Sequence, residues 1–341
     1  MLTETPWLSP ARLENITLPN RFVRSAPELF AAGEDGHISP YELAAYEELK
    51  SEPIGTVITA NTCVSPEGRS GKNQNAFWDE SFFADQAAIL KAARSGERKV
   101  IFQLGHGGIR AEGSNGGLPV YSPDNMTLTV LQGIVEAFVR AAENAKELGF
   151  DGVQVHSAHS YLLSQMFYPQ YNHRRDAYGG SVDNRLRMLL EIVAGIKISC
   201  GDEFPVFVKL NGTNAVENDQ YILHVRRAAE LMKREGVEAL ELSGYEPSPA
   251  GKVNAPYFFS RAACLAAETE LPIILVGGIR KMKDVEDALA AGITAVSVSR
   301  PLLRDPDFFT HLLNGEDARC IGCNRCFGGA DRREYRCVFR S

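Results

Sequence analysis

The sequence has 341 residues, of which 44% are hydrophobic and 23% charged, a composition typical of a globular protein and not of a disordered or fibrous one. Lys and Arg number 36 against 43 Asp and Glu, and the net charge of −7 disfavours nucleic acid or an anionic membrane as a partner. Because no stretch approaches the roughly 20 apolar residues of a membrane-spanning helix and the first residues lack a signal-peptide pattern, we expect a cytoplasmic protein.

Short runs rich in Val, Ile and Phe alternate along the chain with longer segments of helical periodicity. Eight runs predict strands, at residues 21–27, 56–64, 99–106, 152–157, 206–212, 239–244, 272–278 and 295–300. Among the segments between them, 130–148 and 183–198 each place a row of apolar residues on one helical face. Eight such repeats favour a closed (β/α)8 TIM barrel over an open doubly wound sheet. We expect one barrel domain over residues 1–315 and a short cysteine-rich tail, 316–341, packed on it.

Polar side chains lie around the end of the fourth predicted strand and within the fifth, where a barrel of this kind carries its functional groups. His156, His159 and Tyr161 form a His-x-x-His-x-Tyr set after the fourth strand, which predicts two hydrogen-bond donors and a phenol in one pocket. Zinc binding is the alternative for the histidines. Lys209 lies within the fifth strand, where a lysine needs a charged partner, either a ligand or Glu241 on the next strand.

The seventh and eighth predicted strands end in residues suited to an anion. Gly277 and Gly278 end the seventh strand, and Ser299 and Arg300 end the eighth. Glycines let backbone amides approach an anion closely, and the serine and arginine add donors, so this corner predicts a phosphate site. The alternative is that the glycines only turn the chain and that Arg300 pairs with Asp305.

Four of the seven cysteines lie close together near the end of the sequence. Cys320, Cys323, Cys326 and Cys337 are interspersed with arginines, and thiolates at this spacing predict a metal site that holds either an iron–sulfur cluster or zinc. The other three, Cys63, Cys200 and Cys264, lie in predicted strands or helices, and we expect them to be small buried hydrophobes.

Several stretches resemble the Old Yellow Enzyme family of flavin reductases, which includes NADH:flavin oxidoreductases, 2,4-dienoyl-CoA reductase and the N-terminal barrel of trimethylamine dehydrogenase. They are LPNRF at 18–22, QLGHGG at 103–108, GFDGVQVHSAHSYL at 149–162 and NHRRDAYGGS at 172–181. The resemblance implies FMN across the barrel mouth with NAD(P)H as reductant, and Leu29, in place of a cysteine, implies that FMN is noncovalent. By motif position the FMN contacts would be Ala26, Pro27, Glu28, Ala60, Gln103, Lys209, Gly277, Gly278, Ser299 and Arg300.

The resemblance also implies an activity. His156 and His159 would bind an electron-withdrawing group of a small-molecule substrate and Tyr161 would protonate carbon, so we expect reduction of activated alkenes. A dehydrogenase or demethylase-like oxidation of amines is the alternative with the same cofactor. Alternatives of other classes are a Schiff-base aldolase that uses Lys209 and a noncatalytic redox relay that uses the cysteines.

The cysteine string is similar to the iron–sulfur segment of 2,4-dienoyl-CoA reductase and trimethylamine dehydrogenase, which implies a 4Fe–4S cluster. In those larger relatives the cluster links FMN to a second nucleotide-binding half. Because this sequence stops at Ser341, we expect electrons to come from NAD(P)H directly or from a separate electron-transfer protein. A homo-oligomer is left open.

Overall fold

The computed structural model describes residues 5–213, 219–245, 256–327 and 336–340. Its central feature is a ring of parallel strands in which each strand pairs with the next and β4 pairs with β6 to close the ring. In order around the ring the strands are β3 (Phe22–Arg24), β4 (Thr56–Ile58), β6 (Lys99–Gly105), β7 (Gly152–Ser157), β8 (Val206–Asn211), β9 (Val237–Ser243), β10 (Ile273–Val276) and β11 (Ala295–Val298). The predicted (β/α)8 barrel is confirmed.

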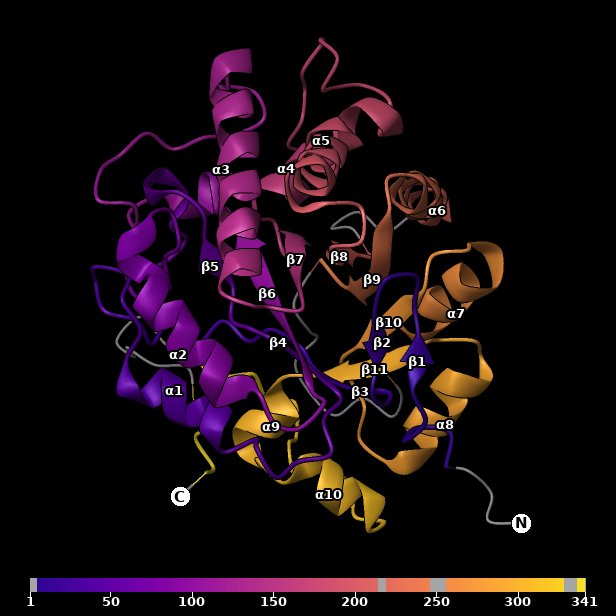
Figure 1. Cartoon of the computed structure of the whole chain (residues 1–341). Coiled ribbons are helices and arrows are strands. Elements are labelled where there is room, and N and C mark those ends of the chain that lie inside the picture. Colours follow the sequence, from indigo (N-terminus) through magenta and orange to yellow (C-terminus); the bar gives the residue numbers. More distant parts are fainter. Residues whose placement is uncertain (1–4, 214–218, 246–255, 328–335, 341) are drawn as a thin grey trace.

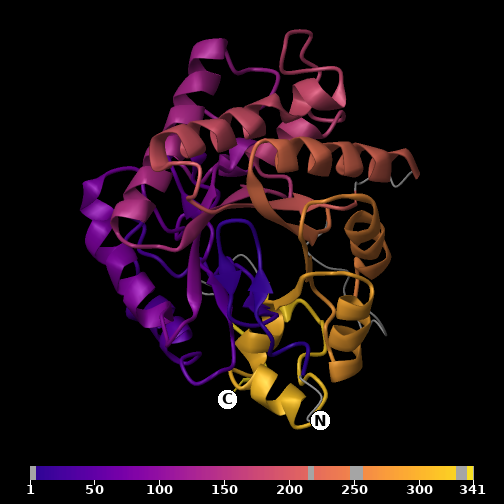
Figure 2. The ribbon, with the colours of Figure 1, turned by 45° about the vertical axis from the view of Figure 1, so that its right-hand side comes forward.

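Helices surround this ring on the outside (Figures 1 and 2). The longer ones are α1 (Pro40–Glu47), α2 (Phe83–Ala93), α3 (Leu128–Glu147), α5 (Val182–Cys200), α6 (Asp219–Arg234), α7 (Phe259–Glu268) and α8 (Met282–Ala290). Shorter ones are α4 (Leu162–Phe167), α9 (Arg300–Arg304) and α10 (Phe308–Leu313). The helices predicted at 130–148 and 183–198 correspond to α3 and α5, whose first turns are capped by the side chains of Thr127 and Ser181. Among the described residues, no helix combines the length and apolar character needed to cross a membrane.

The barrel interior forms a core of its own and is closed at one end by a hairpin (Figure 2). The hairpin consists of β1 (Ala11–Arg12) and β2 (Thr17–Leu18), which pair antiparallel. Its Leu18 is fully buried against barrel residues such as Ile101 and Phe207. The backbone N–H groups of Glu14 and Asn15 in its turn donate to the Glu238 carboxylate, at 3.1 and 2.8 Å. The hairpin therefore seals the amino-terminal end of the barrel, and the opposite end is left for ligands.

One predicted strand is split in the structure. The run 56–64 forms β4 and a second short strand, β5 (Thr62–Cys63), which pairs with β6 beyond the point where β4 ends. Residues 59–61 lie between the two strands, so the alternation of side chains predicted for one continuous strand is interrupted there. This break decides which residue of the segment reaches the barrel mouth.

The segment after α10 lies against the barrel at the described positions. The backbone N–H of Ala318 donates to the Arg280 carbonyl at 2.7 Å, and the Arg340 guanidinium lies 2.8 Å from the Glu48 carboxylate at the end of α1. Arg304 of α9 donates to the Phe339 carbonyl. Both ends of the described tail therefore contact the barrel. The domain boundary between residues 315 and 316 stays a prediction.

Candidate active site

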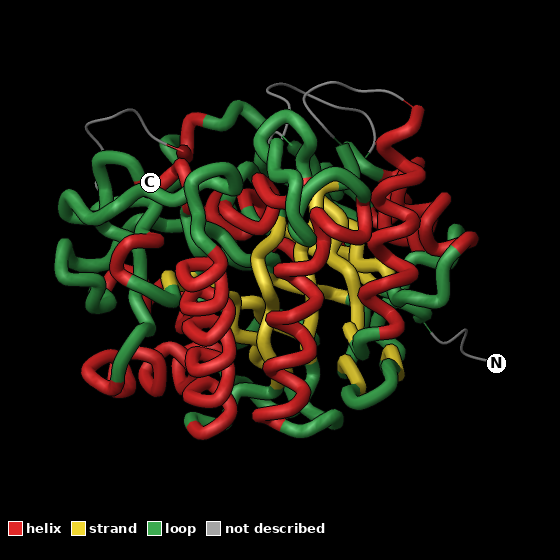
Figure 3. The backbone as a smooth tube through the Cα atoms, turned by 90° about the horizontal axis from the view of Figure 1, so that it is seen from above, coloured by secondary structure: helices red, strands yellow, loops and turns green. Residues whose placement is uncertain are grey.

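A cavity of about 680 Å³ opens at the carboxyl ends of the barrel strands, where loops gather at one end of the barrel (Figure 3). Each of the eight strands contributes lining residues from its end or from the loop that follows it. The size is typical of a small-molecule site. The lining includes these predicted site residues: Ala26, Pro27, Glu28, Gln103, His156, His159, Tyr161, Lys209, Gly277, Gly278, Ser299 and Arg300.

Ala60 is the exception among the predicted residues of the barrel. It is buried outside the cavity lining, and its backbone N–H donates to the Tyr46 hydroxyl at 2.8 Å. Its neighbour Asn61 lines the cavity instead, because the chain turns between β4 and β5. Asn61 is only 3% exposed, and its amide makes no hydrogen bond of good geometry among the described residues, although it lies near the Glu28 carboxyl. A buried amide of this kind needs a further partner, either a ligand or water.

Lys209 has the charged partner that its position in a strand requires. Its Nζ lies 3.0 Å from the Glu241 carboxylate and donates to the Ser25 hydroxyl at 2.8 Å. Burial alone would raise the pKa of Glu241, but the charge of Lys209 and the hydrogen bonds from Ser297, Ser25 and Lys209 together outweigh it, and the pKa is lowered. The ion-pair interpretation of Lys209 is therefore confirmed, and because Lys209 also lines the cavity, its contact with a ligand stays a prediction.

A buried row of polar side chains extends from this ion pair to Gln103. Gln154 donates to Glu241 at 3.2 Å and accepts a hydrogen bond from the Gln103 amide at 2.6 Å. Gln154 is fully buried on β7 and was not predicted as a site residue. Because the Gln154 nitrogen donates to Glu241, the Gln154 oxygen is left to accept from the Gln103 nitrogen, and this fixes which way the Gln103 amide faces.

The His-x-x-His-x-Tyr set forms one wall of the cavity. The ring centroids of His156 and His159 lie 5.1 Å apart, those of His156 and Tyr161 lie 4.9 Å apart, and His159 Nε2 is 2.8 Å from the Ser243 hydroxyl. Burial, together with the charge of Lys209, lowers the pKa of His159 to about 3. Burial and the charges of His159 and Lys209 lower the pKa of His156 well below its usual range. Both rings are therefore neutral at pH 7, and each carries one N–H.

The predicted phosphate corner combines two glycines of left-handed backbone conformation with an arginine that hydrogen bonds hold in place. Gly277 and Gly278 have φ angles of 87° and 80°, in the left-handed region that favours glycine. Arg300 donates to the Asn324 side chain and, at 3.3 Å, to the Tyr257 hydroxyl. Asp305, the alternative partner of Arg300, instead contacts His311 at 2.9 Å and Arg319 at 3.6 Å.

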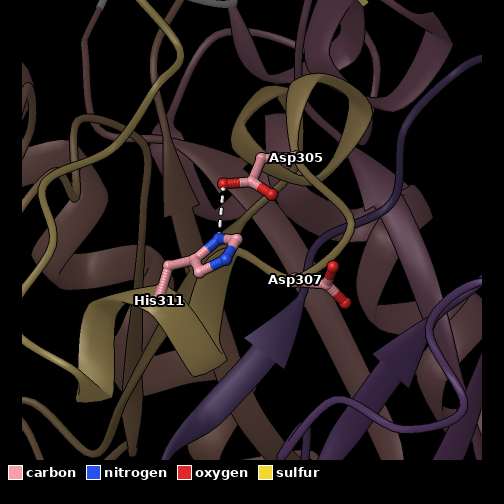
Figure 4. A group of neighbouring side chains, drawn as sticks. All are labelled: Asp305, Asp307 and His311. Carbon is pink, nitrogen blue, oxygen red and sulfur yellow. Dashed lines mark hydrogen bonds and ion pairs between the residues drawn. The ribbon is translucent and has the colours of Figure 1, made fainter.

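Asp305 also belongs to a group of side chains that could hold a cation. Asp305, Asp307 and His311 bring one ligand atom each to within 4.8 Å of the others (Figure 4). The group lies outside the cavity lining, and the Asp305 carboxylate contacts His311, while the Asp305 backbone carbonyl accepts a hydrogen bond from the Phe308 N–H. With Arg319 as a further neighbour, the Asp305 carboxylate already has partners within the protein.

The four tail cysteines surround a second, much smaller cavity. Cys320, Cys323, Cys326 and Cys337 line it together with Arg300, Arg304 and Arg319. Burial and the neighbouring cysteines raise the pKa of Cys326 to about 11, although Arg300 opposes the shift. Of the other cysteines, Cys63 and Cys200 are buried as predicted, while Cys264 is half-buried.

Comparison with known proteins decides the family. Residues 7–318 match the NADH:flavin oxidoreductase / NADH oxidase family. The chain belongs to this family. It is 30% identical to an NADPH dehydrogenase of Bacillus licheniformis over 89% of this chain and 91% of that protein. It is also 30% identical to an NADH oxidase of Thermoanaerobacter brockii over 94% of this chain, but spans only 53% of that protein.

Solved structures show the same barrel. The Old Yellow Enzyme homologue from Zymomonas mobilis matches with a TM-score of 0.78 at 21% identity, over 90% of this chain and 92% of that one. A 2-naphthoyl-CoA reductase matches with a TM-score of 0.83 at 22% identity, over 95% of this chain and 54% of that one. Membership of the Old Yellow Enzyme family is confirmed, and this NADH:flavin oxidoreductase is an FMN-dependent oxidoreductase.

Proposed function

We propose that the protein reduces activated alkenes with electrons from NAD(P)H. The observation that carries the proposal is the wall of two neutral imidazoles and a tyrosine, His156, His159 and Tyr161, in the same cavity as the glycine and arginine corner. The NADPH dehydrogenase relative, which this chain spans almost completely, supports NAD(P)H as the direct reductant.

The residues of the cavity fit FMN. The left-handed glycines 277 and 278, with Ser299 and Arg300, suit its phosphate, and the unsatisfied amide of Asn61 suits the polar edge of its ring. Lys209 and Gln103 would hold the ring from the other strands, with Ala26, Pro27 and Glu28 beside it. When bound, FMN supplies the hydride that an alkene accepts at its β-carbon. Leu29 has no nucleophile, which supports noncovalent binding.

Lys209 supplies a fixed positive charge at the base of the cavity. The ion pair with Glu241 and the hydrogen bond to Ser25 hold its ammonium group in place before any ligand arrives. A charge that is already oriented stabilises negative charge where it develops without reorganisation. A Schiff-base lysine reacts as the free amine, so this ion pair argues against the aldolase alternative.

His156 and His159 bind the carbonyl or nitro oxygen of the substrate. As neutral rings they donate N–H hydrogen bonds and transfer no proton at neutral pH, so the oxygen gains donors as its charge grows. Nδ1 of His156 is buried without a partner among the described residues, which supports a ligand contact at this ring. Tyr161, beside His156, holds the proton that the α-carbon receives.

We infer further that the tail cysteines hold a metal centre. Four thiols around one small cavity, with three arginines in its wall, suit the negative charge of thiolate ligands. A 4Fe–4S cluster fits this set, with zinc as the alternative. A cluster would allow exchange of single electrons with a separate electron-transfer protein, in addition to direct reduction by NAD(P)H.

One preparation tests both proposals. Protein purified without oxygen is analysed for flavin, iron, sulfide and zinc, and NAD(P)H oxidation is then measured with enones, nitro compounds and amines. We expect bound FMN and turnover with enones. A colourless protein, or one that turns over amines but not enones, would contradict the proposed reaction; zinc or no metal would contradict the cluster.

A further inference from the structure

The cysteine tail forms part of the wall of the proposed FMN cavity. Ala318, Cys320 and Gly322 line this cavity beside Gly278 and Arg300. The tail and the phosphate corner are joined by two arginines. Arg280 donates to the Cys320 carbonyl at 2.6 Å, and Arg300 donates to the side-chain oxygen of Asn324. Arg300 also lines the small cavity of the cysteines, so it lies at the border between the two sites.

The backbone of the tail is shaped for the contact between Asn324 and Arg300. Gly322 and Asn324 have φ angles of 68° and 59°, both in the left-handed region. Asn324 is one of only four non-glycine residues with positive φ among the described positions. Asparagine tolerates this conformation better than most residues, and its short amide can reach a neighbouring group. The turn between Cys320 and Cys326 thus presents the Asn324 amide to the barrel.

Arg300 is held from two directions before a ligand binds. One terminal nitrogen of its guanidinium donates to Asn324, and the other lies 3.3 Å from the Tyr257 hydroxyl, with the guanidinium carbon 5.8 Å from the centroid of the Tyr257 ring. A free arginine side chain has many rotamers, and fixing one of them in advance lowers the entropy lost on binding. Because a guanidinium has five N–H donors, these two contacts leave the group able to act as an anion ligand as well.

The chemistry of Asn324 suits this role. Its neutral carboxamide accepts a hydrogen bond from Arg300 without neutralising the charge, whereas an aspartate would compete with a phosphate for the same cation. From these observations we propose that Asn324 is a positioning residue for the cofactor phosphate, and that the cysteine tail thereby determines how tightly the protein binds FMN. The inference rests on the proposed phosphate corner at Gly277, Gly278, Ser299 and Arg300.

The experiment compares the affinities of the flavin-free protein for FMN and for riboflavin, which lacks the phosphate. Asn324→Gly removes the amide and keeps a residue that adopts positive φ. We expect the FMN dissociation constant to rise about 3- to 10-fold, the loss of one hydrogen bond, and that of riboflavin to stay the same. Arg300→Ala should raise the FMN constant by roughly 10- to 100-fold, and adding Asn324→Gly to it should have no further effect. Flavin fluorescence on titration gives each constant.

The matched control is Arg340→Ala. Arg340 anchors the tail through the Glu48 carboxylate but lines neither the FMN cavity nor the cysteine cavity, so the FMN affinity of this variant should equal that of the wild type. Metal content is measured for every variant, to separate the loss of the Asn324 contact from loss of the metal centre. If Asn324→Gly does not fold, Asn324→Asp keeps the backbone preference and the contact with Arg300, and it should weaken FMN but not riboflavin.

The outcomes separate the two proposals. If Arg300→Ala binds FMN like the wild type, the phosphate corner itself is wrong. If Arg300→Ala weakens FMN while Asn324→Gly or Asn324→Asp does not, the corner stands and the role of Asn324 is overturned. Equal weakening of FMN and riboflavin binding in Asn324→Gly, or the same weakening of FMN binding in Arg340→Ala, would also overturn it, because the tail would then act only as a wall.

Discussion

Burial sets the charge of the ionisable side chains around the cavity. It lowers the pKa values of His156 and His159, so that the substrate wall consists of neutral donors, and it raises the pKa of Glu28 well above its usual range. Glu28 follows Pro27 at the edge of the cavity, where a neutral carboxyl adds a hydrogen-bond donor and no negative charge. Glu241 is the contrast, since Lys209 lowers its pKa in spite of burial. The charged pair of Lys209 and Glu241 therefore shares the cavity with a substrate wall of neutral imidazoles.

The role of Tyr161 is open to a kinetic test. Tyr161→Phe should leave reduction by NAD(P)H unchanged, because that step needs no proton from the substrate wall. The subsequent reaction with an enone should slow about 10²- to 10⁴-fold, the usual contribution of a general acid. A nitro acceptor, whose product can leave unprotonated, should slow much less. Stopped-flow measurement of the two half-reactions checks this, and equal slowing with enone and nitro acceptors would assign the proton to another group.

Glu42 makes the stability of the fold depend on pH. The Glu42 carboxyl is buried and accepts a hydrogen bond from the Asn75 amide, and burial raises the pKa of Glu42 to about 7. In the unfolded chain it titrates near 4.5, so between these pH values the folded state binds the extra proton and stability falls as pH rises. Glu42→Gln should remove this loss. Relative to the wild type, its free energy of unfolding should gain about 3 kcal/mol between pH 4.5 and pH 8.

Urea denaturation at several pH values measures this difference for Glu42. Glu48 of the same segment is exposed enough to serve as the control position, and Glu48→Gln should show no such gain. A difference between Glu42→Gln and the wild type that stays constant with pH would show that the carboxylate is not penalised in the folded state.

At the scale of elements, the β1–β2 hairpin supplies the apolar side chains that cover the barrel interior at its amino-terminal end. Leu18 is fully buried there, while the preceding residue, Thr17, is exposed. Leu18→Ala should lower the free energy of unfolding by about 2 to 5 kcal/mol, because the small cavity it leaves is walled by rigid strands. Thr17→Ala is the matched control and should change it by no more than about 0.5 kcal/mol. Equal effects of the two changes in urea would mean that the hairpin does not close the barrel.

Sequence periodicity predicts the elements of this fold that are long enough to show a pattern. All eight barrel strands were predicted, because each carries either a run of apolar residues or an alternation of apolar and polar ones. The hairpin was not, since its strands have only two residues each, too few for any alternation. The prediction that Ala60 lines the cavity was wrong for a similar reason. The break between β4 and β5, which brings Asn61 to the cavity instead, is not marked by proline or glycine.

The site residues that sequence reasoning found are those that chemistry marks, such as the histidine pair and the strand lysine. Gln154 and Asn324 were missed, because a single amide has no motif and its role depends on what the fold places beside it. For Gln154 the signal that could have found it is a polar residue inside an otherwise apolar strand, two positions before His156. For Asn324 the sequence offers only its place between two cysteines.

Over the whole molecule, the charge of the cavity is opposite to that of the protein. The net charge is −7, but the cavity lining includes Arg110, Lys209, Arg280 and Arg300. Concentrating cations at the mouth of the barrel attracts an anionic ligand locally, while the acidic remainder keeps the surface unattractive to nucleic acids. Net charge alone therefore could not reveal the anion site.

The whole chain is also needed to assemble the cysteine cavity, because Cys337 comes from the far end of the tail while Cys320, Cys323 and Cys326 directly follow the barrel. If the four thiols hold one metal centre, Cys337→Ser removes a quarter of its ligands and should reduce bound metal to a small fraction of the wild-type amount. Cys264→Ser, at a half-buried cysteine of α7, is the control and should keep the metal in full.

Elemental analysis of protein purified without oxygen measures the metal content of the two variants. The visible spectrum shows whether a broad cluster absorbance disappears while the flavin bands remain. Wild-type metal content in Cys337→Ser would remove Cys337 from the ligand set, and an absence of metal in the wild type as well would mean that the four thiols hold no metal centre.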